Sequence, residues 1–298
     1  MKIRIGSRGS DLALWQANFV KDQLVELGHD VDIKIIVTKG DQIQDLSFDK
    51  IEGKGFFTKE IEEALLSNEV DLAVHSHKDL ETTSPEGLMI AAVSHRADPK
   101  DILLIRNEGF SDVMFLDMKQ DAIVGTSSAR RRTQIRRLRP DVEIKDLRGN
   151  VPTRVQKLKD GQYDAIILAA AGISRLNLDL SNLRIVELDP TWFVPAPAQG
   201  VLGLQIRETD LDLNEALRAI HHPDVAERIA IERGVLRLME GGCQLPLGVY
   251  CIKEFDEYVV YTSYTDDKEG EAEISSYQTN DKVGLIETIA EDLKNELS

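Results

Sequence analysis

The feature that most constrains the fold is a regular alternation of short apolar runs with longer amphipathic segments. Asp11–Leu27 carries apolar residues at helical spacing, Ser10 is suited to cap it, and Gly28 ends it. Strands that alternate with such helices predict βαβ units, and therefore an α/β domain with a largely parallel sheet. The other elements predicted in this first part are strands at Lys2–Gly6, Val31–Val37, Asp71–His75 and Met89–Val93 and a helix from Thr58.

The same alternation starts again near Pro99 and indicates a second α/β unit. Prolines at 190, 195 and 197 mark Pro190–Gly200 as a crossover or hinge. A helix is predicted at Val225–Met239, and the last 50 residues have the pattern of a small α+β unit. The predicted strands of the second unit are Ile102–Ile105, Ala122–Gly125, Val142–Asp146 and Asp164–Ala169, its helices are Ser127–Leu138 and Val151–Lys159, and the small unit has strands at Tyr258–Tyr264 and Glu271–Tyr277 and a helix at Val283–Leu297.

The charge of the chain limits its partners. There are 36 Lys and Arg against 52 Asp and Glu, so the net charge is −16. A chain this acidic repels nucleic acids and anionic membranes. No apolar run reaches the ~20 residues of a membrane span, and Asp11 interrupts any signal-peptide core. We therefore expect a cytoplasmic protein that binds neither nucleic acid nor membrane.

The charge is unevenly distributed, because Gly125–Asp160 carries +7. One interpretation is a solvated basic face that pairs with acids elsewhere. The local order supports a second one. Gly125–Ser128 joins a strand to a helix whose first turn holds Arg130 and Arg131, and Arg148-Gly149-Asn150 joins the next strand to the next helix. Helix N-termini at the carboxyl ends of strands bind anions, and arginine binds carboxylates in a bidentate way, so this region is a candidate carboxylate site.

The first unit has matching strand-to-helix junctions. Gly6–Ser10 places Arg8 and Ser10 at the ligand edge of the predicted sheet, and Gly53–Gly55 precedes a helix that bears Lys59. Neither segment fits the GxxxxGK[ST] pattern, so nucleotide hydrolysis is not supported.

His75-Ser76-His77-Lys78-Asp79 is the densest polar cluster, and it follows an apolar strand. Two histidines and an aspartate are compatible with a metal site, although such clusters are more often hydrogen-bonded strand ends. A third interpretation is an aspartate held beside a lysine for acid–base or cation-stabilising chemistry.

The chain has two cysteines, and no Cys/His pattern suggests zinc. Cys251 lies in an apolar run and is expected to be a small buried hydrophobe. Cys243 lies in the tight loop Gly241-Gly242-Cys243-Gln244-Leu245-Pro246, which has no apolar periodicity. A thiolate in such a loop is available as a soft nucleophile that holds a group covalently.

Taken together, these segments resemble the porphobilinogen deaminase family. The similarity extends in the family's order from Leu12 to Pro246, whereas the tail after Cys251 matches only in general character. The matching segments are LALWQA (12–17), TKGD (38–41), GKGFFTKE (53–60), AVHSHKD (73–79), GTSSARR (125–131), LRGNVPTR (147–154), YDAIILAAAG (163–172) and EGGCQLP (240–246).

The resemblance implies two lobes like those of periplasmic anion-binding proteins and a small α+β domain. It assigns residues 1–98 and 199–220 to domain 1, 99–198 to domain 2 and 221–298 to domain 3. It also implies a dipyrromethane cofactor joined to Cys243 by a thioether. Four porphobilinogen molecules are added to this primer with loss of ammonia, and hydroxymethylbilane is released. The implied protein is a monomeric enzyme of haem and porphyrin biosynthesis whose partner is this small-molecule substrate, with no metal.

The resemblance also implies roles for individual residues. Asp79 is the implied catalytic carboxylate, which stabilises the cation left when porphobilinogen loses ammonia. The implied cofactor-binding residues are Cys243, Arg8, Ser10, Lys78, Thr126, Ser127, Ser128, Arg130, Arg131, Arg148 and Gly149. The implied substrate-binding residues are Arg8, Ser10, Arg148, Arg154, Arg175, Lys54, Lys59 and Gln199.

Some positions depart from the family pattern. His77 stands where the family usually has Met, and Glu81 where it usually has Pro. A binding protein for a small dianion on the same two-lobed scaffold is the alternative function. The Cys243 loop and Asp79 count against that alternative.

Overall fold

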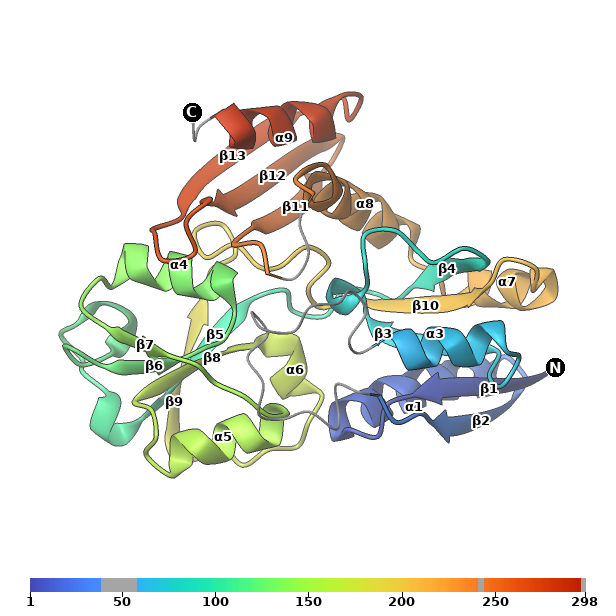
Figure 1. Ribbon diagram of the computed structural model, residues 1–298, viewed down its shortest axis with the longest axis horizontal. Helices are drawn as coiled ribbons and strands as arrows, with labels where there is room; N and C mark the ends of the chain where they lie inside the picture. Colours follow the sequence, from blue (N-terminus) through green and yellow to red (C-terminus); the bar gives the residue numbers. More distant parts are fainter. Residues whose placement is uncertain (39–57, 241–243, 296–298) are drawn as a thin grey trace. The chain divides into compact units, whose positions relative to one another are not determined.

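The computed structural model describes residues 1–38, 58–240 and 244–295 (Figure 1). The chain divides into two compact units. Unit 1 comprises Met1–Ala97 and Gly200–Glu227, and unit 2 comprises Asp98–Gln199 and Arg228–Ser298. Lys54 and Cys243, two of the predicted site residues, lie outside the described residues.

Unit 1 is built on a five-stranded sheet with the order β2-β1-β3-β10-β4. The first three strands in this order are parallel, whereas β10 is antiparallel to both of its neighbours. The strands are β1 (Lys2–Ser7), β2 (Asp30–Ile35), β3 (Leu72–Ser76), β4 (Leu88–Val93) and β10 (Leu202–Arg207).

Helices cover both faces of this sheet. Helix α1 (Asp11–Glu26) begins at Ser10, whose hydroxyl accepts a hydrogen bond from the Ala13 amide. Together with α7 (Leu211–Leu217), α1 packs on the face that carries Ile3, Ile5, Leu72 and Val74. Helix α3 (Lys59–Leu66) packs on the opposite face through Ile61, Ala64 and Leu65.

Unit 2 contains a second five-stranded sheet, with the order β7-β6-β8-β5-β9. Its pattern repeats that of unit 1, because three parallel strands are followed by one, β5, that is antiparallel to both neighbours. The strands are β5 (Asp101–Arg106), β6 (Ile123–Gly125), β7 (Glu143–Lys145), β8 (Ala165–Ala169) and β9 (Leu183–Leu188).

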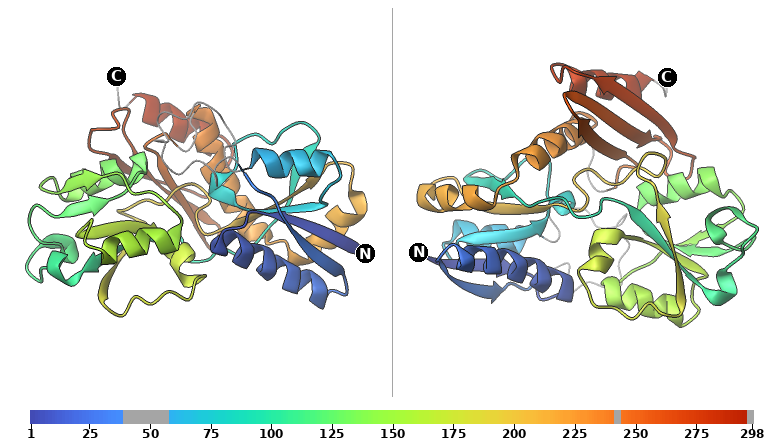
Figure 2. Two further views of the ribbon diagram at one scale, coloured as in Figure 1. Left: turned by 60° about the horizontal axis from the view of Figure 1, so that its bottom comes forward. Right: turned by 180° about the vertical axis from the view of Figure 1, so that it is seen from behind.

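Helix α4 (Ala129–Leu138) packs on one face of this sheet and α5 (Val151–Lys159) on the other. The short helix α6 (Ala170–Ser174) follows β8 directly (Figure 2). Unit 2 also holds an antiparallel sheet of β11 (Gly248–Glu254), β12 (Glu257–Tyr264) and β13 (Glu273–Thr279). Helices α8 (Pro223–Leu238) and α9 (Leu285–Asn295) share its core.

The predicted α/β class with two sheet-and-helix lobes and a small α+β part is confirmed. The expectation of a largely parallel sheet in the first lobe holds for β1, β2 and β3, whereas β10 is antiparallel to both of its neighbours. The reason is that β10 returns from residue 202 and enters between β3 and β4. The division into three domains stays a prediction.

Candidate functional site

In unit 1 the predicted site residues lie at the carboxyl ends of two adjacent strands. β1 and β3 are parallel neighbours, with Ile5 opposite Leu72 and Gly6 opposite Ala73. Arg8 and Ser10 therefore follow β1 on the same sheet edge where Lys78 and Asp79 follow β3. The fold brings these four residues to one edge of the sheet.

Asp79 ends a single turn of 3-10 helix, His77–Asp79, that continues directly from β3. Asp79 is exposed, Lys78 is half-buried and His77 is buried. A Cβ on Gly203 would lie 3.2 Å from Cδ2 of His77 and 2.9 Å from Cδ1 of Leu80, so this turn packs directly on the glycine backbone. The departure at His77 is thus a buried ring beneath the turn, and the aspartate carboxylate is left accessible.

His75, at the end of β3, is almost fully buried. Its Nε2 lies 3.1 Å from Oε1 of Gln205, and Nε2 of Gln205 donates to Oε1 of Glu62 at 3.0 Å. Burial lowers the pKa of His75 to about 4, and the positive charge of Arg8 also lowers this pKa. The imidazole is therefore neutral at pH 7. Sequence reasoning missed Gln205 and Glu62.

In unit 2 the strand ends are joined by Ser127. Its hydroxyl donates to the Leu147 carbonyl and accepts from the Leu147 amide, each at 3.0 Å. Thr126 is buried, and its Oγ1 accepts from the Ser128 amide at 3.2 Å. The junctions that follow β6 and β7 therefore lie together. The Ser128 side chain does not cap α4.

Arg148 and Gly149 precede α5, which Asn150 caps by accepting a hydrogen bond from the Thr153 amide. Gly149 has φ +108°, and a Cβ there would lie 2.7 Å from the Thr153 side chain, so only glycine fits. Arg154 donates through Nε to the Gly149 carbonyl at 2.7 Å. These contacts bring the backbone of the junction and the Arg154 side chain together.

Arg175 follows α6, which itself follows β8, and is half-buried. Burial lowers the pKa of its guanidinium to about 10. The group is still charged at pH 7, so it is a partly desolvated cation suited to a carboxylate.

Arg130 and Arg131 are buried, and both contact the protein's own Asp101. Arg130 Nη1 lies 2.7 Å from Oδ2 of Asp101, and Arg131 Nη2 lies 2.7 Å from Oδ1. Arg131 also donates to the Ile167 carbonyl at 3.0 Å. The two guanidinium charges hold the pKa of Asp101 far below its usual range despite complete burial. Binding of cofactor carboxylates by this pair stays a prediction.

Gln199 is fully buried in the crossover segment. Its Nε2 donates to the Pro99 carbonyl at 2.7 Å and to Oδ1 of Asp101 at 3.0 Å. The next-door residue Ala198 has φ +62°, a conformation costly for a residue with a Cβ, and its amide donates to buried Glu232 at 2.7 Å. Gln199 thus links the crossover segment to the start of β5, and its contact with substrate stays a prediction.

Other arginines of α4 and its flank also pair with acids. Arg132 contacts Asp146, Arg136 contacts Glu269, and Arg139 contacts Asp141. The interpretation of the basic window as a face that pairs with acids elsewhere therefore holds for much of α4.

Lys59 is exposed at the start of α3, and Cys251 is a fully buried thiol, as expected. Among the described residues, no three His, Cys, Asp or Glu side chains are placed to hold a metal ion. Within the same part of the chain, no helix is long and apolar enough to cross a membrane.

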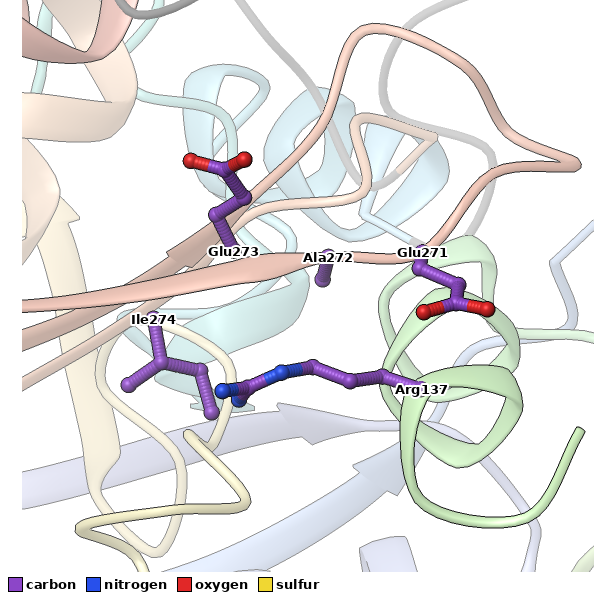
Figure 3. A pocket seen from close by; sticks show the side chains of 5 residues that line it. All are labelled: Arg137, Glu271, Ala272, Glu273 and Ile274. Atoms are coloured by element: carbon purple, nitrogen blue, oxygen red, sulfur yellow. The ribbon is translucent and has the colours of Figure 1, made fainter.

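A cavity of about 400 Å³ in unit 2 lies away from the predicted site (Figure 3). It is lined by Arg137 from the last turn of α4 and by residues 271–274 at the start of β13. The predicted cofactor-binding residues of this helix lie at its opposite, N-terminal end. The carboxylates of Glu271 and Glu273 point away from each other, so they do not converge on a common ligand.

Residues 3–215 match the family profile described as "Porphobilinogen deaminase, dipyromethane cofactor binding domain". Curated relatives named porphobilinogen deaminase include those of Oceanobacillus iheyensis (45% identical, covering 90% of this chain and 86% of the relative) and Syntrophobacter fumaroxidans (47%, covering 83% and 78%). The relative from Shouchella clausii is 42% identical and covers 100% of this chain and 92% of its own length.

Among solved structures, the periplasmic VFT2 domain of BvgS from Bordetella pertussis aligns with 78% of this chain and 92% of its own, at 18% identity and a TM-score of 0.43. The fold assignment rests instead on the topology of the two sheets described above. With 42–47% identity over most of its length and a matching profile, the chain belongs to the porphobilinogen deaminase family.

Proposed function

We propose that this chain joins four porphobilinogen molecules head to tail on a dipyrromethane primer held by Cys243, and releases hydroxymethylbilane, with Asp79 as the catalytic carboxylate. The observation that carries the proposal is the match of residues 3–215 to the cofactor-binding domain of porphobilinogen deaminase. The accessible carboxylate of Asp79 at the ligand edge of unit 1 supports the assignment of the catalytic group.

The residues present are suited to a carboxylate-rich group. Each pyrrole of this kind carries an acetate and a propionate, so successive rings need repeated cationic or N–H donors. The N-termini of α4 and α5 offer backbone amides, and Arg148 and Arg154 lie at the second of them. Arg8 and Lys78 supply charge at the edge of unit 1. The bound dipyrromethane supplies a nucleophilic pyrrole carbon as the primer for chain growth.

Asp79 does what an arginine cannot. Its carboxylate accepts hydrogen bonds from pyrrole N–H groups and stabilises the positive charge that forms as the substrate loses ammonia. Lys78, Arg8 and Ser10 bind and orient the substrate carboxylates beside it. We also propose that Ser127, Ser128, Arg130, Arg131, Gly149, Arg175, Lys54, Lys59 and Gln199 contribute to binding of cofactor or substrate.

We further propose that the enzyme works as a monomer in the cytoplasm. A cysteine that must hold its partner through a thioether needs a reducing compartment to stay available before loading. The net charge of −16 disfavours nucleic-acid and membrane partners. Sedimentation of the purified protein should give the mass of one chain.

Intact mass is the direct test of the covalent group. Purified active protein should exceed the sequence mass by ~420 Da, since the thiolate of Cys243 holds the group covalently. Cys243→Ser should show the bare mass, no colour with Ehrlich's reagent and no turnover. Cys251→Ser is the matched control and should keep both mass and colour. An unmodified mass in an active preparation would refute the proposal.

Asp79→Asn tests the catalytic assignment. The variant should keep the added mass while turnover falls by at least about 100-fold, because the amide cannot stabilise the cation or accept the proton. Unfolding in urea should be unchanged, since Asp79 is exposed. Near-normal turnover would rule out Asp79 as the catalytic group.

A further inference from the structure

A continuous chain of buried side chains runs beneath the Asp79 turn in unit 1. It begins at Thr58, whose Oγ1 donates to Oε2 of Glu62 at 3.4 Å, and it continues through Gln205 to His75. All four side chains are at most 9% exposed. They come from the start of α3, from β10 and from β3, which are packed against one another (Figure 1).

The chemistry of this chain sets the direction of each hydrogen bond. A carboxylate only accepts, so Gln205 must turn its NH₂ group toward Glu62. The amide oxygen of Gln205 then faces His75. An oxygen there requires a donor, so Nε2 of His75 carries the ring proton and Nδ1 is the acceptor nitrogen. The charge of Glu62 thereby selects one tautomer of a ring that it does not itself contact.

The position of the chain connects it to the catalytic turn. His75 lies directly opposite Gly203 in the β3–β10 ladder, and His77 and Leu80 of the turn pack on that same glycine. A wrong tautomer would set the lone pair of Nε2, in place of its proton, against the Gln205 oxygen, or turn the buried amide away from Glu62. Either change leaves a buried polar atom unsatisfied directly beneath the turn.

We propose that Glu62 and Gln205 are positioning residues for the reaction, which act by fixing the Nε2–H tautomer of His75 and thereby holding the end of β3 and the Lys78–Asp79 turn. The ring is neutral at pH 7 because it is buried. The proposal rests on Asp79 being the catalytic carboxylate, and none of its residues needs to touch substrate.

The first test needs no variant beyond the one used for assignment. Protein labelled with ¹⁵N-histidine, in its cofactor-loaded form, should show His75 as the Nε2–H tautomer in two-bond ¹H–¹⁵N correlation spectra at pH 7, with the signal assigned by its loss in His75→Asn. An Nδ1–H tautomer in the unaltered protein would overturn the proposal.

The second test breaks the chain and then rebuilds it. In Glu62→Gln the new amide can donate or accept, so it no longer fixes the orientation of the Gln205 amide, and both His75 tautomers should appear. We expect kcat to fall about tenfold through lost positioning, with KM changed by less than about twofold. The double variant Glu62→Gln/Gln205→Glu again has one carboxylate and one amide. In it the amide at position 62 donates to the carboxylate at position 205, and that carboxylate accepts from Nε2–H of His75. This double variant should restore the single tautomer and most of kcat.

Glu63→Gln is the matched control, because Glu63 is the exposed neighbour on the same helix. It should change neither the tautomer nor kcat. The proposal fails if Glu62→Gln leaves both unchanged, or if the tautomer responds but kcat does not. Failure of the catalytic assignment is separately visible, since it would show as turnover retained in Asp79→Asn.

Discussion

In unit 1 the corner where β3 ends beside the start of β10 buries an imidazole, whereas the matching corner of unit 2, where β8 ends beside the start of β5, buries a carboxylate. The two sheets have the same strand pattern, although His75 faces α3 and Asp101 faces α4. The matching ends of the two strand pairs therefore hold different buried groups, an imidazole on the α3 side of one sheet and a carboxylate on the α4 side of the other.

The two corners differ in how the buried group is stabilised. His75 is uncharged at pH 7, so its ring needs hydrogen bonds but no counter-charge. Asp101 keeps its charge, and two guanidinium groups and Gln199 compensate it. The first corner is therefore sensitive to mild acid, and the second is sensitive to loss of a partner.

The largest effect is expected from Asp101→Asn. This change leaves two buried guanidinium groups without their counter-charge, which costs about 3–5 kcal/mol of unfolding free energy. Urea unfolding at pH 7, followed in unit 2, measures it. Glu143→Gln, which breaks an exposed pair with Lys145, is the control and should cost about 0.5 kcal/mol or less. Equal losses in the two variants would show that burial of Asp101 does not decide its energetic role.

The next effect is a pH response that differs between the units. The pKa of His75 is about 4 in the folded state against an ordinary 6.5, so the unfolded chain takes up the proton first as pH falls. The stabilisation is complete above pH 6.5 and is lost between 6.5 and 4, by about 3 kcal/mol in unit 1. The pKa of Asp101 is lowered from an ordinary 3.8, so its contribution to stability is lost only below pH 3.8. Asp101 should therefore cause no loss of unit 2 stability between pH 6.5 and 4.

Hydrogen exchange of β3 and β8 peptides in urea, compared at pH 7 and about pH 5, separates the two responses. His75→Gln should flatten the response of β3, because glutamine does not titrate. A parallel loss of protection in both strands would contradict the assignment of the acid response to His75.

The smallest effect is expected from Arg131→Lys. A lysine keeps the charge beside Asp101 but cannot also reach the Ile167 carbonyl with a second donor in fixed geometry. We expect a loss of about 1–2 kcal/mol in urea unfolding, well below that of Asp101→Asn. A loss as large as that of Asp101→Asn would show that the geometry of the arginine, and not the charge balance, holds this corner.

Much of the fold follows from local pattern. The prediction of a helix over Asp11–Leu27 matches α1 at Asp11–Glu26, because the cap and the apolar spacing are both local. Strand β10 was not predicted. On one face of this strand, Gly203 and Gln205 stand where a buried strand usually has apolar side chains. Gly203 packs under the Asp79 turn, and Gln205 belongs to the buried polar chain with Glu62 and His75.

The candidate site was predicted in part for a similar reason. Strand ends that carry Arg8 and Asp79 are visible in the sequence, since parallel strands bring such ends together. The ion pairs of Arg130 and Arg131 with Asp101 could not be predicted, because Asp101 lies about 30 positions away in the sequence. The sequence shows it only as an acidic residue at the start of an apolar strand.

The return of β10 also sets an order of assembly. β4 pairs with β10 within the described sheet, and β10 begins more than a hundred residues after β4 ends. At ~5–20 residues per second of synthesis, β4 waits roughly 5–20 seconds for its partner. The sheet of unit 2 spans only residues 101–188 and is complete earlier. The lobe that carries the Lys78–Asp79 turn is therefore the first to be started and, of the two five-stranded sheets, the last to be closed on the ribosome.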